Sequence, residues 1–320
     1  MMNKTWKRTA GSLLALTMAL SGGGAVFALE GQPAPAAGEA AITAVPGNAA
    51  AIKKMYNEYI RLASSSKTLG QAVAYLNKHI GEADKWTASM MVLRLENAQT
   101  AGLESLQDRI AASSVQKSID AAWRKGSSGS IDSLIKNAAD EKTKKLLGEA
   151  RSQGYRISTA EGMYFPEIDY VSYEAYKSHV GADIAAYIAM MSLETSKPTL
   201  RDAAIIIGWG ELLQRNLAQE KFLRSYPSSN RKAKVESMYR LTKWNVFYGS
   251  NNTPLFDYES KVIDAKAVEA YKKAVADGDV SKSPLLLKLS NFLKVSDRNG
   301  GKLTDELSLW RSKQIPMQYN

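Results

Sequence analysis

The 320-residue chain contains no cysteine and only two histidines. The absence of cysteine excludes disulfides, thiolate nucleophiles, cysteine-ligated zinc, iron–sulfur clusters and a lipidated N-terminal cysteine. Neither His79 nor His179 lies in a His-x-x-x-His or Glu-x-x-His sequence, and two histidines cannot build a three-histidine metal site. No phosphate-binding loop, dinucleotide fingerprint or zinc-protease motif occurs. We therefore expect no metal and no cofactor.

The N-terminus has the pattern of a secretory signal peptide. An apolar stretch, Gly11–Leu20, follows a positively charged start, and Ser21–Gly24 then interrupts it. Val26 and Ala28 are small residues at the −3 and −1 positions of a signal-peptidase site. The positive start consists of Lys4, Lys7 and Arg8. We predict cleavage after Ala28, so that residues 1–28 are removed.

The alternative to cleavage is a retained membrane anchor. The uninterrupted apolar run is far shorter than the roughly 20 residues that span a bilayer, and no later apolar run approaches that length. The mature chain is therefore expected to have no transmembrane segment. Removing residues 1–28 lowers the net charge from +10 to +7. Residues 29–47, rich in Ala, Gly and Pro, are predicted to be a flexible linker.

From residue 48 onward the hydrophobic period is that of helices. The first amphipathic helix carries its apolar residues at Ile52, Met55, Tyr56, Tyr59, Ile60 and Ala63. Further helices are expected at Glu82–Ala101, ended by Gly102, and at Thr199–Tyr226. Another should begin at Pro284 with Ser283 as its cap. The predicted class is all-α, an irregular multi-helix array.

One segment departs from the helical pattern. Short extended runs at Tyr155–Ile157 and Met163–Phe165 flank a turn, which predicts one small β-hairpin near residues 155–165. We place the boundary between an N-terminal helical region, 48–153, and a C-terminal helical region, 154–320, at this break.

Part of the C-terminal region resembles a tetratricopeptide-like hairpin. Residues Leu217–Ser229 form a helix end with the sequence Phe-Leu-x-x-Tyr-Pro-x-Ser, and Val235 and Tyr239 follow on a second amphipathic helix. Pro227 would stop the first helix, and Ser228 or Ser229 would cap the next. The resemblance covers some 30 residues, and the 34-residue period of a solenoid is not repeated elsewhere.

More loosely, the second half resembles uncharacterised secreted helical proteins of spore-forming Gram-positive bacteria. Residues Glu161–Tyr170 and Asn252–Tyr258 carry this resemblance. It implies export and a helical fold, and it assigns no functional residue.

Three carboxylates lie among aromatic residues in the segment that contains the predicted hairpin. Glu161, Glu167 and Asp169 are the weak catalytic candidates, because a carboxyl group desolvated by neighbouring rings can become a general acid. A secreted hydrolase that cuts cell-wall glycan could use one of them. The alternative is an ordered connecting loop whose acids cap helices or pair with Arg156 and nearby lysines.

A second candidate is the aromatic loop Asn251–Tyr258. Its Asn, Thr and Pro residues favour turns, whereas Leu255, Phe256 and Tyr258 favour burial. Such a loop is either structural or a binding loop.

A third candidate is a basic stretch on the predicted tetratricopeptide-like helical hairpin. Seven cations lie between residues 221 and 243, against one acid, Glu236. They form a candidate surface for an anionic cell-wall polymer, although most charge runs are solvated helix faces. The seven are Lys221, Arg224, Arg231, Lys232, Lys234, Arg240 and Lys243.

The sequence thus favours a secreted, cell-wall-associated and non-catalytic binding or scaffold module. Its expected partner is an anionic wall polymer or another envelope protein. Nucleic acid would suit the charge, but export argues against it. The alternative remains the secreted hydrolase.

Overall fold

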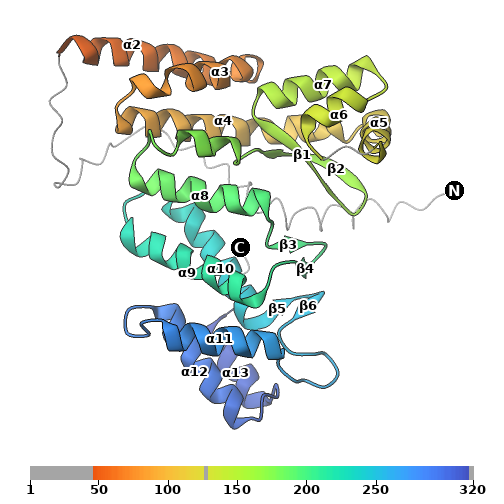
Figure 1. Ribbon diagram of the computed structural model, residues 1–320, viewed down its shortest axis with the longest axis vertical. Helices are drawn as coiled ribbons and strands as arrows, with labels where there is room; N and C mark the ends of the chain where they lie inside the picture. The colour runs from red at the N-terminus through yellow and green to blue at the C-terminus, as the bar shows by residue number, and fades with distance from the viewer. Residues whose placement is uncertain (1–45, 126–128, 317–320) are drawn as a thin grey trace. The chain divides into compact units, whose positions relative to one another are not determined.

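The computed structural model describes residues 46–125 and 129–316, which form twelve α-helices and three two-stranded antiparallel sheets (Figure 1). Helices make up 68% of the structure, so the predicted all-α class is confirmed. The predicted signal peptide, 1–28, lies outside the described residues. So does the predicted linker, 29–47, except where helix α2 begins at Pro46.

The chain divides into two compact units between Gly181 and Ala182. In the first unit, α2, α3 and α4 pack against one another, and α5–α7 follow. Its elements are α2 Pro46–Ala63, α3 Leu69–His79, α4 Lys85–Ile110, α5 Ser113–Arg124, α6 Ile131–Asn137, α7 Glu141–Ser152, β1 Tyr155–Ala160 and β2 Met163–Ile168; 3-10 turns lie at Ser66–Thr68, Ile80–Glu82 and Ser172–Tyr176.

The predicted hairpin is present as β1 and β2, with Ala160 opposite Met163. Its two-residue loop, Glu161-Gly162, has positive φ at both positions, as a type I′ turn requires. Strand β2 packs on α4 and α5, and β1 packs on α7. These contacts place the hairpin in the first unit, so the division lies after Gly181 rather than at the predicted boundary between residues 153 and 154.

Buried polar groups join the hairpin and the following turn to α4. The fully buried Gln99 donates to the carbonyl of Gln153 at 2.7 Å and accepts a hydrogen bond from Tyr173. Tyr155 donates to the carbonyl of Gln99 at 2.7 Å, and the alanine methyl that Gly102 lacks would lie only 2.7 Å from this phenol oxygen. Gly102 therefore allows this close approach inside α4 and does not end the helix, contrary to our prediction.

The second unit is built on the pair α9 and α10, with α8, α11, α12 and α13 around it. Its elements are α8 Ala182–Ser196, β3 Leu200–Arg201, β4 Ala204–Ile205, α9 Trp209–Ser225, α10 Lys232–Tyr248, β5 Gly249–Ser250, β6 Thr253–Pro254, α11 Ala265–Asp277, α12 Pro284–Arg298 and α13 Asp305–Gln314. Phe247, Phe292 and Trp310 pack ring to ring in its core.

Helix boundaries in this unit agree with the sequence only in part. Helix α12 begins at Pro284, and the Ser283 hydroxyl accepts from the amide of Leu286 at 3.1 Å, as predicted. The helix predicted at Thr199–Tyr226 is wrong over its first part, because residues 200–205 form the β3–β4 hairpin. Positive φ at Asp202 and Ala203 makes this turn, and α9 begins only at Trp209.

Candidate functional site

None of the three acidic candidates lines the pocket described below. Glu161 is exposed at the tip of the β1–β2 hairpin. Glu167 is opposite Arg156 in the strand register, 4.0 Å from its guanidinium nitrogen. Asp169 accepts from the amide of Val171 at 3.2 Å and so shapes the following turn. Their placement matches the connecting-loop alternative and gives the hydrolase hypothesis no support.

The basic stretch covers α9, α10 and the turn between them. Three of its cations lie at the start of α10: Arg231 and Lys234 are each 5.8 Å from the centroid of the Tyr187 ring on α8, and Lys232 is exposed. Lys221 and Arg224, on the last turns of α9, are also exposed. Ser229 accepts from the amide of Arg231 and donates to Asp183, so it orders the turn but does not cap the helix as predicted.

The remaining two cations lie further along α10. The Lys243 ammonium is 4.9 Å from the Tyr239 ring centroid, and burial together with nearby Lys288 and Arg240 lowers the pKa of this amine. Arg240 lies 4.0 Å from Glu236 on the same helix. The seven cations of the basic stretch thus lie on α9, α10 and the turn between them, and we call this set the basic surface. Lys288 of α12 extends it.

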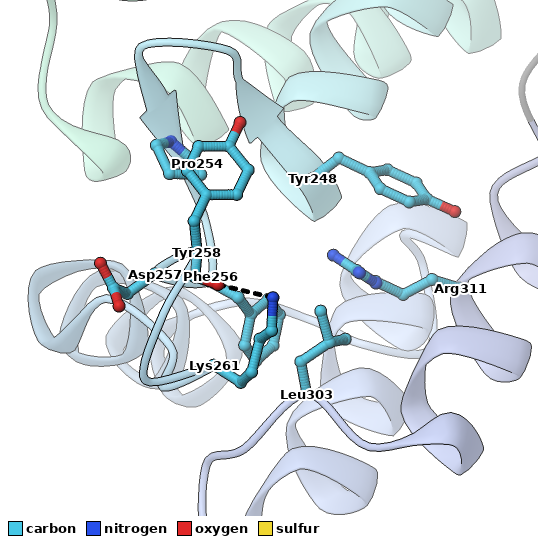
Figure 2. Close-up of a pocket in the computed structure, with 8 residues that line it drawn as sticks. All are labelled: Tyr248, Pro254, Phe256, Asp257, Tyr258, Lys261, Leu303 and Arg311. Atoms are coloured by element: carbon cyan, nitrogen blue, oxygen red, sulfur yellow. Dashed lines mark hydrogen bonds between the residues drawn. The ribbon is translucent and has the colours of Figure 1, made fainter.

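The aromatic loop Asn251–Tyr258 lines a pocket of about 190 Å³ in the second unit (Figure 2). Leu255 and Phe256 are buried as predicted, but Tyr258 is 62% exposed, contrary to the prediction. The pocket is lined by Tyr248, Pro254, Phe256, Asp257, Tyr258, Lys261, Leu303 and Arg311. We call it the Arg311 pocket.

Hydrogen bonds to two neighbouring segments fix the loop that carries these residues. Asn252 donates to the carbonyl of Asp202 at 2.7 Å, and the Thr253 hydroxyl accepts from the amide of Ile205 at 3.1 Å. On the other side, the amide of Leu303 donates to the carbonyl of Lys261 at 2.8 Å. The pocket walls are thus held by hydrogen bonds to the β3–β4 hairpin and to the segment before α13.

Arg311 is the most buried charged group of the pocket, with 8% of its surface exposed. Its guanidinium carbon lies 4.5 Å from the centroid of the Tyr248 ring and 5.0 Å from that of Phe256. One Nη atom donates to the carbonyl of Phe247 at 3.2 Å. Burial lowers the pKa of Arg311, yet a guanidinium keeps its proton in proteins. The pocket therefore contains a fixed positive charge between two aromatic rings.

Lys261 supplies a second cation. Its ammonium donates to the carbonyl of Tyr258 at 2.6 Å, and its backbone has φ of 58°. Asp257 accepts from the amides of Glu259 and Ser260, which lowers the pKa of its carboxyl and engages it in its own turn. In Figure 2 the Asp257 carboxylate points away from Arg311 and Lys261. The side of the pocket between the two cations is thus electropositive.

Sequence reasoning found the loop but missed Arg311 and Lys261. Arg311 lies on α13, more than fifty residues beyond Tyr258, in a short helix whose sequence gives no sign of a site. Lys261 lies in the irregular segment after the loop. The only available signal was the aromatic loop itself, which could indicate a pocket wall but not what faces it.

His79 lies 3.0 Å from Glu82 and packs against the Tyr75 ring, with 4.3 Å between the ring centroids and the planes tilted by 35°. Within residues 46–125 and 129–316, no cluster of three or more His, Asp or Glu side chains could hold a metal. No helix in the same ranges is long and apolar enough to cross a bilayer.

Comparison with known proteins gives no relative: no family model, no curated protein and no solved structure matches the chain.

Proposed function

We propose that the chain is an exported, non-catalytic binding module of the cell envelope, and that its basic surface holds an anionic wall polymer. The observation that carries this proposal is the charge of residues 221–243, which contain seven cations and one acid, Glu236. A polymer with a repeating phosphate, such as a teichoic acid, can contact several of these cations at once.

The start of α10 strengthens the proposal. The N-terminal end of a helix carries a partial positive charge, so acidic residues are normally favoured in its first turn. Helix α10 has no acid there and instead begins with Arg231, Lys232 and Lys234. An anion near this end of the helix would be attracted by the helix dipole and by these side chains together.

Replacing three of these cations should weaken polymer binding without unfolding the protein. For Arg231→Gln/Lys232→Gln/Lys234→Gln, we expect about hundredfold weaker retention on cell walls that carry teichoic acid, at about 1 kcal/mol per cation. Binding of the unaltered chain should be lost above roughly 0.2 M salt, where screening shortens the reach of exposed charges. Co-sedimentation of the purified chain with walls across a salt series measures both effects.

The matched control removes three lysines from α7 in the other unit, as Lys142→Gln/Lys144→Gln/Lys145→Gln. It lowers the net charge by the same amount and should leave retention unchanged. Equal loss in both triple variants would mean that net charge alone attracts the chain. Retention that is independent of salt, or of teichoic acid on the wall, would overturn the proposal.

The export half of the proposal has its own test. In a Gram-positive host, the chain should appear in the medium or on the wall with Leu29 as its first residue, as mass spectrometry of the intact protein would show. Ala28→Lys should block cleavage, because the −1 position needs a small side chain. Ala25→Leu, outside the −3 and −1 positions, should be processed normally. A chain that stays in the cytoplasm in every case would contradict export.

A further inference from the structure

The Arg311 pocket contains a buried cation for which the described residues provide no counter-ion. No carboxylate within residues 46–125 and 129–316 forms an ion pair with Arg311, although only 8% of its surface is exposed. Its Nε atom is buried and has no hydrogen-bond partner. Removing a guanidinium from water without a partner is costly, and contacts with two rings and one carbonyl offset this only in part.

A second buried arginine in the same unit shows the usual arrangement. Arg215 is 7% exposed, and its two Nη atoms bind Glu194 at 2.8 Å and Glu211 at 2.6 Å. The Nε atoms of both arginines lack partners, so the two differ in their Nη contacts. The guanidinium of Arg215 contacts two carboxylates. That of Arg311 donates to one carbonyl oxygen and otherwise lines the pocket. Within the part of the chain that the structure describes, Arg311 lacks the carboxylate counter-ion that Arg215 has.

The pocket has room for a bound anion that would serve as this counter-ion. Figure 2 shows the nitrogen atoms of Arg311 and Lys261 pointing into the space below Tyr248 and beside Tyr258. A planar guanidinium binds carboxylate or phosphate oxygens in pairs, and an ammonium adds a point charge. The exposed ring of Tyr258 and the ring of Pro254 give an apolar wall against which the body of a ligand could lie.

The volume limits what can enter. A volume of about 190 Å³ is below the roughly 300–1,000 Å³ of pockets that enclose a drug-sized ligand, so it suits one sugar-sized body and not a polymer segment. We propose that the Arg311 pocket binds a small ligand, or the end of a larger one, through a carboxylate or phosphate group held between Arg311 and Lys261. This site goes beyond the proposed function, since about 24 Å of α10 separates Tyr248 from the cations that begin the helix.

The test uses the full chain in phosphate-free buffer of low salt, with three probes of similar size. Glucuronate carries a carboxylate on a ring, glucose 6-phosphate carries a phosphate, and glucose is the neutral control. We expect at least one anionic probe to bind in calorimetry and to raise Tm, because a ligand that binds only the folded state stabilises it. Whichever anion binds identifies the group, and glucose should have no effect.

Two variants locate the binding. Arg311→Met should lower affinity at least a hundredfold, and Lys261→Asn about tenfold, since asparagine tolerates the positive φ at this position. Lys266→Gln, an exposed lysine on α11, should have no effect, nor should the triple variant at residues 231, 232 and 234. No binding of either anion at 10 mM would overturn the inference, as would equal binding by the unaltered chain and Lys261→Asn. The second variant keeps the test valid if Arg311→Met fails to fold.

Discussion

Gly249→Ala should destabilise the second unit by about 4 kcal/mol. Gly249 follows α10 with φ of 78° and ψ of −159°, a conformation that is essentially restricted to glycine. A methyl group there would lie 2.3 Å from the carbonyl oxygen of Thr253 and 2.4 Å from the amide nitrogen of Leu255. Both are backbone atoms of the loop that lines the Arg311 pocket, so they cannot move aside without breaking β5 and β6.

The matched control is Gly162→Ala in the β1–β2 turn. Gly162 has a similar φ of 76°, but nothing lies within 4 Å of the position that a methyl group would take. Its cost should be about 1 kcal/mol, from the backbone conformation alone. Urea unfolding of both variants measures the difference. Equal losses would show that the close approach of backbone atoms at Gly249 is not the source of its effect.

Arg215→Met should cost about 3 kcal/mol, because it leaves the carboxylate of Glu194 without its arginine and Glu211 with Lys197 alone. Both carboxylates are about one-third exposed, which places the loss at the lower end of the range for broken buried ion pairs. Glu194 also accepts from the amide and hydroxyl of Thr199, so we expect the β3–β4 hairpin to loosen first. Hydrogen exchange of the amides at residues 199–206 would detect this local opening.

The same substitution at Arg311 should behave differently. Arg311→Met removes a buried charge that has no carboxylate partner among the described residues. The relief of its desolvation opposes the loss of one hydrogen bond and two ring contacts. The net change should lie within about 1 kcal/mol of zero. A loss at Arg311 as large as that at Arg215 would show that Arg311 serves the fold and not a ligand.

The sequence predicted those elements that local signals specify. Ser283-Pro284 marks the start of α12 by cap and ring geometry, and two extended runs around Glu161-Gly162 mark the first hairpin. The two other hairpins have two-residue strands that depend on each other, since Asn252 bonds the turn of β3–β4 and Thr253 bonds Ile205. Such pairs leave no period in the sequence. The sequence therefore predicts a helix where β3 and β4 lie and a loop where β5 and β6 lie.

The two candidate sites likewise differ in whether their residues lie close together in the sequence. The basic surface is local in sequence, because its seven cations lie on two consecutive helices, and the structure keeps them on that pair. The Arg311 pocket is not local, since Tyr248, Lys261 and Arg311 come from three separate segments. Hydrophobic pattern placed Tyr258 in the core, yet its ring lies at the surface beside the pocket, where a contact with ligand would replace burial.

The most direct test of the central claim is a single incubation of the purified chain with cell walls that carry teichoic acid. Sedimentation measures retention, and the supernatant is assayed for released glycan. We predict that salt reverses retention and that the triple variant at residues 231, 232 and 234 is not retained. We also predict that no glycan is released. Release of glycan fragments, or retention that the variant keeps in full, would contradict a non-catalytic module that binds through its basic surface.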